Sequence, residues 1–268
     1  MSWLVIARQE AWLTATARSV RLLAGLLVLV CAVGAYVFPV FDPGPHTTAH
    51  FGGYVSGWLG TLVPLIGLVV GYNAVVGERR SGALALSLSL PHGRRDVVFG
   101  KLLGRLAPVV AAIVAGALIA GALVVYPFGE LALAPFLAFV GATITLGVVY
   151  TALGVAISTF VATKTRATVA AFGVYVLVVV WTELEAAIEL ALASIGSPGE
   201  GVPTAVEVLL ALEPTTAYDR IVAGAIDPAG SVGDAWYLDE WVALALLVLW
   251  ATVPLAIAYR RFAGVDLP

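Results

Sequence analysis

Residues 94–126 have the sequence RRDVVFGKLLGRLAPVVAAIVAGALIAGALVVY. Four basic side chains precede Leu106, and no charged residue follows it until Glu130. A helix rises about 1.5 Å per residue, so about 20 apolar residues cross a hydrocarbon core about 30 Å thick. We therefore expect residues 106–126 to form a transmembrane helix with its basic end at the membrane surface.

Five other apolar runs are long enough to span a bilayer, at residues 22–40, 58–76, 135–160, 167–184 and 241–259. The chain of 268 residues is 61 % apolar, with a mean hydropathy of +1.01. Soluble domains are less apolar than this. The sequence therefore predicts an all-α integral membrane protein with six transmembrane helices, in which residues 22–268 form a single domain.

The charges are sorted along the chain. Thirteen of the fourteen Lys and Arg residues lie at the N-terminus, in residues 77–105, at 164–166 and at the C-terminus, whereas the other segments hold Arg220 and thirteen of the seventeen acidic residues. Cytoplasmic loops are enriched in Lys and Arg. We expect both termini and residues 77–105 to be cytoplasmic, residues 41–57 and 182–240 to be external, and the protein to be a multi-pass protein of the plasma membrane.

Two segments outside the spans have helical composition. Residues 1–21 place Trp3, Ile6, Leu13 and Val20 roughly on one side, which predicts an amphipathic helix lying on the inner leaflet. Within the outer segment, residues 202–212 and 217–226 are apolar enough to dip back toward the membrane.

Several function classes lack their motifs. The chain has no Walker A sequence, no zinc-protease helix and no nucleophile elbow, so we expect neither ATP binding nor enzymatic activity in this chain. No charged residue falls near the middle of a predicted span, which argues against an ion-coupled carrier. His46 and His50 are weak metal-ligand candidates, because Pro43, Gly44 and Pro45 precede them and soft donors are scarce. No nucleic-acid partner is expected.

The loop from Val76 to Gly104 carries the most specific pattern. VGERRSGALALSLSLP at residues 76–91 is followed by two arginines and then by GKLLG at 100–104. This sequence resembles the cytoplasmic loop of ABC-2 type permeases, in which Glu-Arg/Lys-x-x-Gly-Thr-x-x-x-Leu-x-x-x-Pro precedes paired basic residues and Gly-Lys-Leu-Leu-Gly. Ala83 stands where Thr is frequent. The EPTTAY sequence at 213–218 is similar to an Asn/Ser-Pro-x-x-x-Tyr/Phe element of that family and departs from it at Glu213.

The resemblance covers nearly the whole chain. It implies the membrane-spanning subunit of an ATP-driven transporter, acting as an exporter, as a homo- or heterodimer with a second permease subunit. A separate cytoplasmic ATPase would hold the ATP and Mg, and this chain would bind no cofactor. The alternative is a non-transporting regulator or mechanotransmitter that acts on an outer partner.

The residues themselves favour a short cytoplasmic coupling helix between the second and third spans. Its apolar ridge and charged rim suit docking into a groove of the ATPase, with Gly82 permitting a bend and Pro91 ending the helix. The predicted coupling residues are Glu78, Arg79, Arg80, Gly82, Leu84, Leu86, Leu88 and Pro91, with secondary contacts from Arg94, Arg95 and Lys101. In the alternative interpretation the basic residues contact lipid headgroups, and the last three snorkel at the inner interface.

Overall fold

The computed structural model describes residues 2–41, 44, 46–81, 93–126, 129–195, 204–227 and 235–263. In these ranges the regular structure is helical, and the one β-type contact is an isolated bridge between Thr47 and Glu130. Six described helices are long and apolar enough to cross a membrane, which confirms the predicted class. They are α2 (Arg18–Phe41), α3 (Thr48–Gly71) with its continuation α4 (Val76–Ser81), α6 (Arg94–Val125), α7 (Leu133–Phe160), α8 (Lys164–Ile195) and α11 (Glu240–Ala263).

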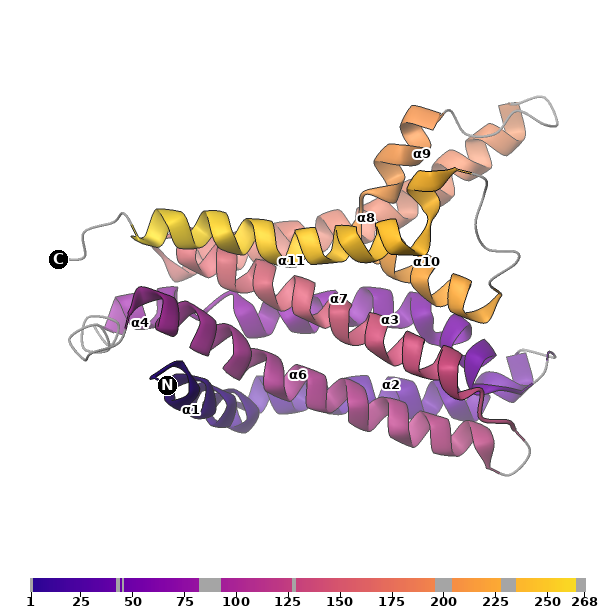
Figure 1. The fold of residues 1–268 in the computed structure, drawn as a ribbon, viewed down its shortest axis with the longest axis horizontal. Helices are drawn as coiled ribbons and strands as arrows, with labels where there is room; N and C mark the ends of the chain where they lie inside the picture. Colours follow the sequence, from indigo (N-terminus) through magenta and orange to yellow (C-terminus); the bar gives the residue numbers. More distant parts are fainter. Residues whose placement is uncertain are drawn as a thin grey trace.

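The spans form three layers (Figure 1). Helices α3 and α7 lie in the middle, α2 and α6 cover one side, and α8 and α11 lie on the other. Both termini and α4 lie at one end of the bundle. We call this the basic end, because Arg79, Lys101, Lys164 and Arg260 are there, and we call the opposite end the acidic end.

Glycine lets the two central helices approach closely. A Cβ atom on Gly71 would lie 2.8 Å from the Cα atom of Gly154, and one on Gly67 would lie 2.8 Å from the backbone nitrogen of Thr151. Small residues at such spacings permit close contact between helix backbones in lipid. The small-residue pair of α3, Gly67 and Gly71, therefore serves packing within the chain.

Helix α8 extends further than the sequence predicts. The predicted fifth span ends at Leu184, because two glutamates flank this residue, but the helix continues to Ile195. Glutamate is a good helix former, so a helix can run past glutamates once it has left the hydrocarbon core. The end of α8 and α9 (Thr204–Ala211) rise away from the bundle at the acidic end (Figure 1).

Helices α3 and α6 also begin earlier than the predicted spans. The hydroxyl of Thr47 accepts a hydrogen bond from the backbone N–H of His50 and caps α3, so the helix starts ten residues before the predicted start at Trp58. Helix α6 starts at Arg94, where Asp96 accepts a hydrogen bond from the backbone N–H of Gly93. Local capping groups set these starts, and a hydropathy window does not detect such groups.

Helix α10 (Pro214–Ile226) lies among the spans, packed against α3, α7 and α11. The carboxylate of Glu213 accepts a hydrogen bond from the backbone N–H of Thr216, so Glu213 takes the capping role that Asn or Ser would take. Tyr218 is fully buried and accepts a hydrogen bond from Thr143. The sequence predicts that Glu213 lies in the outer segment. In the structure, α10 holds Glu213 beside Tyr150, in the middle of α7.

Arg220, the one basic residue outside the basic segments, has a local structural role. Its guanidinium donates hydrogen bonds of 2.9 Å to the carbonyl of Tyr237 and 2.7 Å to the carbonyl of Ala211, the last residue of α9. It therefore joins α10, α9 and the short helix η1 (Trp236–Leu238).

Helix α1 (Ser2–Thr16) is separate from α2. It exposes Leu4, Val5 and Trp12 on its outer side and buries Glu10 against α6. Trp3 and Leu13, from the predicted apolar face, are also exposed, whereas Val20 belongs to α2 and is buried. An exposed apolar side on a helix outside the spans suits an interfacial position.

Candidate functional site: a buried ion network at the basic end

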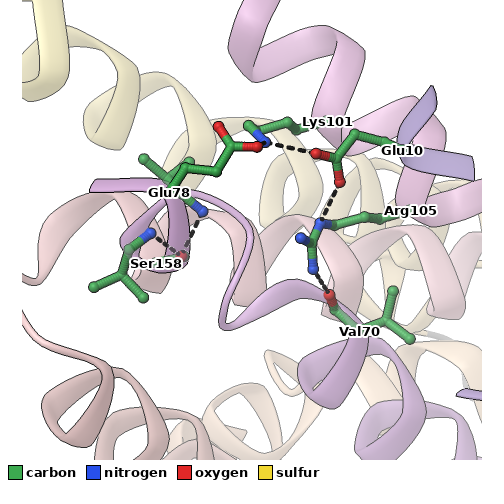
Figure 2. Close-up of polar contacts among 8 residues, drawn as sticks. Glu10, Val70, Glu78, Lys101, Arg105 and Ser158 are labelled. Carbon is green, nitrogen blue, oxygen red and sulfur yellow. Dashed lines mark hydrogen bonds and ion pairs between the residues drawn. The ribbon is translucent and has the colours of Figure 1, made fainter. Parts of the chain in front are cut away.

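The start of helix α4 is capped by a side chain that is distant in the sequence. The backbone N–H groups of Val75 and Val76 donate hydrogen bonds of 2.9 and 3.0 Å to the hydroxyl of Ser158 on α7. The first N–H groups of a helix have no partner within the helix and need such acceptors. Ser158 thus fixes α4 to the basic end of α7 (Figure 2).

Lys101 of α6 lies at the centre of the ion network, which consists of Glu10, Glu78, Lys101 and Arg105. Its ammonium group donates a hydrogen bond of 2.6 Å to Glu10 of α1 and another to Glu78 of α4. Lys101 is only 2 % exposed, so it does not snorkel to the interface as the alternative interpretation supposed. Figure 2 shows the two carboxylates on either side of the lysine.

Arg105 lies one helical turn further along α6 and extends the network to α3. Its Nε donates to Glu10 at 3.2 Å, and its Nη1 donates at 2.6 Å to the carbonyl of Val70. Val70 is in the last turn of α3, where carbonyls have no partner within the helix. Four segments, α1, α3, α4 and α6, therefore meet in one set of contacts.

The network is balanced, with two carboxylates facing one ammonium and one guanidinium group. Removing water from charges is expensive, and a buried ion pair repays that cost only when its partners satisfy one another. Loss of one partner from such a pair destabilises a protein by about 3–5 kcal/mol. The four residues are therefore expected to hold these helices as a unit.

Two glycines of α6 provide the surface on which α1 rests. A Cβ atom on Gly104 would lie 2.6 Å from the carbonyl oxygen of Ala7, and one on Gly100 would lie 2.9 Å from that of Trp3. Both distances are too short for a real Cβ atom. The GKLLG sequence thus supplies the lysine of the network and also the space that lets Glu10 reach it.

Other basic residues form weaker contacts around the network. Arg79 donates at 3.3 Å to the carbonyl of Val161, the residue that follows α7. The Nε of Arg95 donates at 3.1 Å to the hydroxyl of Tyr259 on α11, and the guanidinium group also lies over that ring. These contacts connect α4 to the end of α7 and the start of α6 to α11.

The structure brings only part of the predicted coupling set together. Glu78 and Lys101 are in the network, while Arg79 and Arg95 lie beside it. Arg80 and Arg94 belong to α4 and α6, but their side chains are outside the described part of the structure. Gly82, Leu84, Leu86, Leu88 and Pro91 lie outside the described residues, so the coupling helix stays a prediction.

Sequence reasoning missed three members of the site: Glu10, Arg105 and Ser158. One signal was available for Glu10, since it is the only acidic residue before Asp42 and lies in a segment otherwise rich in arginine. Lys101 and Arg105 are four residues apart and share a helix face. Nothing in the sequence indicates that Ser158 caps α4, because 82 residues separate it from Val76.

The two histidines considered as metal ligands lie at the acidic end, His46 in the connection before α3 and His50 in the first turn of α3. The His50 ring nitrogen Nδ1 is 2.8 Å from the hydroxyl of Thr47, and His46 packs edge-on against Phe38. Among the described residues, no group of three or more His, Cys, Asp or Glu side chains could hold a metal ion. The expectation that this pair is not a required metal site remains a prediction.

Comparison with known proteins assigns the chain to a family. The sequence profile of the ABC-2 family transporter proteins matches residues 58–267, which is most of the chain. The chain belongs to the ABC-2 family. This ABC-2 permease is 34 % identical over 213 residues to the probable ABC transporter permease protein NosY of Pseudomonas aeruginosa. It is 33 % identical over 212 residues to the protein of the same name from Stutzerimonas stutzeri, and each alignment covers 75 % of both chains.

The protein is thus a multi-pass membrane protein and a permease subunit of an ABC transporter. The profile match includes α4, Lys101 and Arg105 but begins after α1. Glu10, which joins the two cations, therefore comes from outside the matched region.

Proposed function

We propose that this ABC-2 permease pairs with a second permease subunit and is driven by a separate ATPase that docks at the basic end on the cytoplasmic side. ATP and Mg are held by that partner. The transport direction that we propose is export. Family membership supports an ATPase partner, and the charge asymmetry supports a cytoplasmic location for the basic end.

The observation that carries this proposal is the buried Lys101, which links α4 to α1 and α6. Residues 82–91 directly follow α4, so a force applied to them reaches Glu78 within a few residues. Because the ion network also holds α1 and the last turn of α3, the force displaces these helices together. Helix α6 is itself a span and carries the movement into the membrane.

In this mechanism, ATP binding closes the partner ATPase subunits, and the closure pushes on residues 82–89. The spans then change between inward-facing and outward-facing arrangements. The partner can shift this equilibrium only if it binds the two arrangements with different affinity. The permease contributes the helices that move and the transport path, and ATP hydrolysis takes place in the ATPase.

The direct test replaces Leu84 and Leu86 by Asp. Burying unpaired carboxylates in an apolar docking groove costs several kcal/mol, so co-purification of the ATPase and substrate-stimulated ATP hydrolysis should fall strongly. Arg94→Ala is the milder comparison. If the double variant inserts normally and keeps full stimulation, residues 82–89 do not transmit force.

The orientation has its own test. In a Cys31→Ser background, a cysteine at Ser197 should react with a membrane-impermeant reagent from outside intact cells, and a cysteine at Ser89 should not. Reaction of Ser197→Cys only from the cytoplasmic side would reverse the proposed topology.

The dimer is tested by cross-linking in native membranes. The pair Gly67 and Gly71 of α3 and the glycines Gly100 and Gly104 of α6 are covered by this chain's own helices. Pairing would therefore use other exposed apolar surface. Full transport by a subunit shown to be monomeric would contradict the dimer.

One observation supports the second candidate, a mechanotransmitter acting on an outer partner. Helix α8 has 32 residues, about 48 Å at 1.5 Å per residue, which exceeds the hydrocarbon thickness of about 30 Å. Its end and α9 expose Leu190 and Leu209. Leu190→Glu with Leu209→Glu should abolish the action of an outer partner while ATPase stimulation persists. Unchanged substrate movement by that variant would favour the transporter.

A further inference from the structure

A cavity of about 190 Å³ lies between α7, α8, α11 and the connection from α9 to α10. Its floor is formed by buried residues, Tyr150 and Leu153 of α7 together with Pro214. Its rim includes Leu177 of α8 and Leu209 of α9, which are 58 % and 54 % exposed. The cavity thus extends from the protein surface to the buried side of α7.

Two polar groups of the cavity wall are bonded to the protein itself, whereas the buried indole N–H of Trp181 has no hydrogen-bond partner among the described residues. The carboxylate of Glu213 accepts a 2.9 Å hydrogen bond from the hydroxyl of Tyr150 and a 2.8 Å bond from the backbone N–H of Thr216. The indole N–H of Trp250 donates at 3.0 Å to the carbonyl of Leu212. The cavity wall therefore consists mainly of hydrocarbon and aromatic surface and favours an apolar occupant.

The cavity lies at membrane depth. Tyr150 is ten residues from the end of α7 at Phe160 and Trp250 is ten residues from the start of α11 at Glu240, each about 15 Å along its helix. Trp181 is about 25 Å from the start of α8 at Lys164. In a core about 30 Å thick, the floor is near the midplane and Trp181 is close to the acidic-end surface.

Helix α8 leaves the bundle at this level and opens a wedge beside α7. Nearer the basic end it packs through Ala171, which is buried, and Val178 is its buried residue on the cavity wall. Beyond these residues the helix diverges from the bundle, and α9 returns beside it (Figure 1). Leu177 and Val180 are exposed apolar residues of α8 on this stretch. In a membrane, the fluid that contacts such a surface is lipid hydrocarbon.

We propose that this cavity is a binding site for one acyl chain of a membrane lipid from the leaflet at the acidic end. A dry apolar cavity of about 150 Å³ holds one benzene molecule, so this site has room for about six to eight carbon atoms of a chain. The chain enters past Leu177 and ends against Tyr150 and Leu153. It fills the wedge between α7 and α8, whose walls would otherwise lack packing partners.

The experiment uses the full chain in nanodiscs made with a phospholipid that carries a photoreactive diazirine near the end of one acyl chain. After irradiation, mass spectrometry should find adducts on Tyr150 and Leu153. Lipids that only surround the protein cannot reach these two residues, because both are buried. The same lipid with its diazirine next to the ester should label Leu177 or Trp181 but not the floor. This measurement needs no variant.

Val178→Trp fills the cavity and should reduce the floor adducts several-fold. Val180→Trp is the matched control, because Val180 is on the same helix, is exposed and is not part of the wall, so its floor adducts should stay at the wild-type level. Three results overturn the proposal: no floor adducts in folded wild-type protein, equal labelling by the two lipids, or cross-linking of Leu177 to a second copy of the chain in place of lipid.

Discussion

The basic end of the bundle and the half toward the acidic end differ in how charges are paired and in how tightly the helices pack. At the basic end, the buried Glu10 and Lys101 pair with the partly buried Glu78 and Arg105 in a cluster that joins four helical segments. In the half of the bundle toward the acidic end, α8 separates from α7 beside an apolar cavity whose floor lies near the midplane, where Glu213 is bonded to Tyr150.

This difference indicates where the molecule is stiff and where it can yield. A cluster of mutually satisfied buried charges resists separation, because any displacement leaves a charge without its partner. A helix that packs loosely beside a cavity has few contacts to lose when it moves. If force is applied to a permease at one end, the helices at that end must be rigid to transmit it. The helices that rearrange must be free to move.

The largest effect is expected from Lys101→Met. It leaves Glu10 and Glu78 without their shared cation, so the free energy of unfolding should fall by about 3–5 kcal/mol. Thermal unfolding in a fixed detergent measures this. Lys164→Met, at an exposed lysine of the same end, should change stability by less than about 0.5 kcal/mol. Equal melting temperatures for the two variants would show that the ion network is not structural, and adding Glu10→Gln to Lys101→Met should restore part of the loss.

Next, two glycine-to-alanine changes, one beside the ion network on α6 and one at an exposed position of α8, should act with opposite sign. Gly104→Ala forces a methyl group against the backbone of α1 and should cost about 1–3 kcal/mol. Gly173→Ala, on α8, meets nothing within 4 Å and should stabilise the helix by up to about 1 kcal/mol. Limited trypsin cleavage at Arg8 should become faster only in the first variant. Equal loss of stability in the two variants would contradict this prediction.

A smaller effect is expected from Glu213→Ala, which removes the cap of α10. Loss of an N-cap costs about 0.5–2 kcal/mol, so hydrogen exchange should become faster in the first turn of α10, at Thr216 above all. Glu213→Gln keeps an acceptor oxygen and should have the weaker effect. Glu207→Ala removes the partner of Tyr237 and should leave α10 protected. Unchanged exchange in Glu213→Ala would show that packing alone holds α10.

The smallest effect is expected from the double variant His46→Ala with His50→Ala. The His50 ring contacts Thr47 and the His46 ring contacts Phe38, so a modest loss of stability near the start of α3 is expected, with no change in metal content. Elemental analysis of the purified protein together with an activity assay checks this. Loss of a stoichiometric metal along with activity would contradict it.

Hydropathy predicts the spans but not where their helices end. Residues 135–160 match α7 closely, because no charged residue lies between Glu130 and Lys164 and the apolar run there is long enough to form a single span. Leu184 does not end α8, since the glutamates beside it stop the apolar run and not the hydrogen-bonded helix. Glu213 appears remote from every span in the sequence, and only the packing of α10 brings it to Tyr150.

By itself the sequence determines the class of the protein, the number of spans, the uneven distribution of charge and, through the 76–104 pattern, the family. These properties depend on composition and local spacing. The thickness of the bilayer sets the length of apolar sequence that forms a spanning helix. The partners of the buried charges are decided only by tertiary structure. Glu10 and Lys101 are 91 residues apart, and they meet because α1 rests on Gly100 and Gly104. The side chains that meet across two helices depend on how the helix surfaces pack together. That packing cannot be read from one sequence alone.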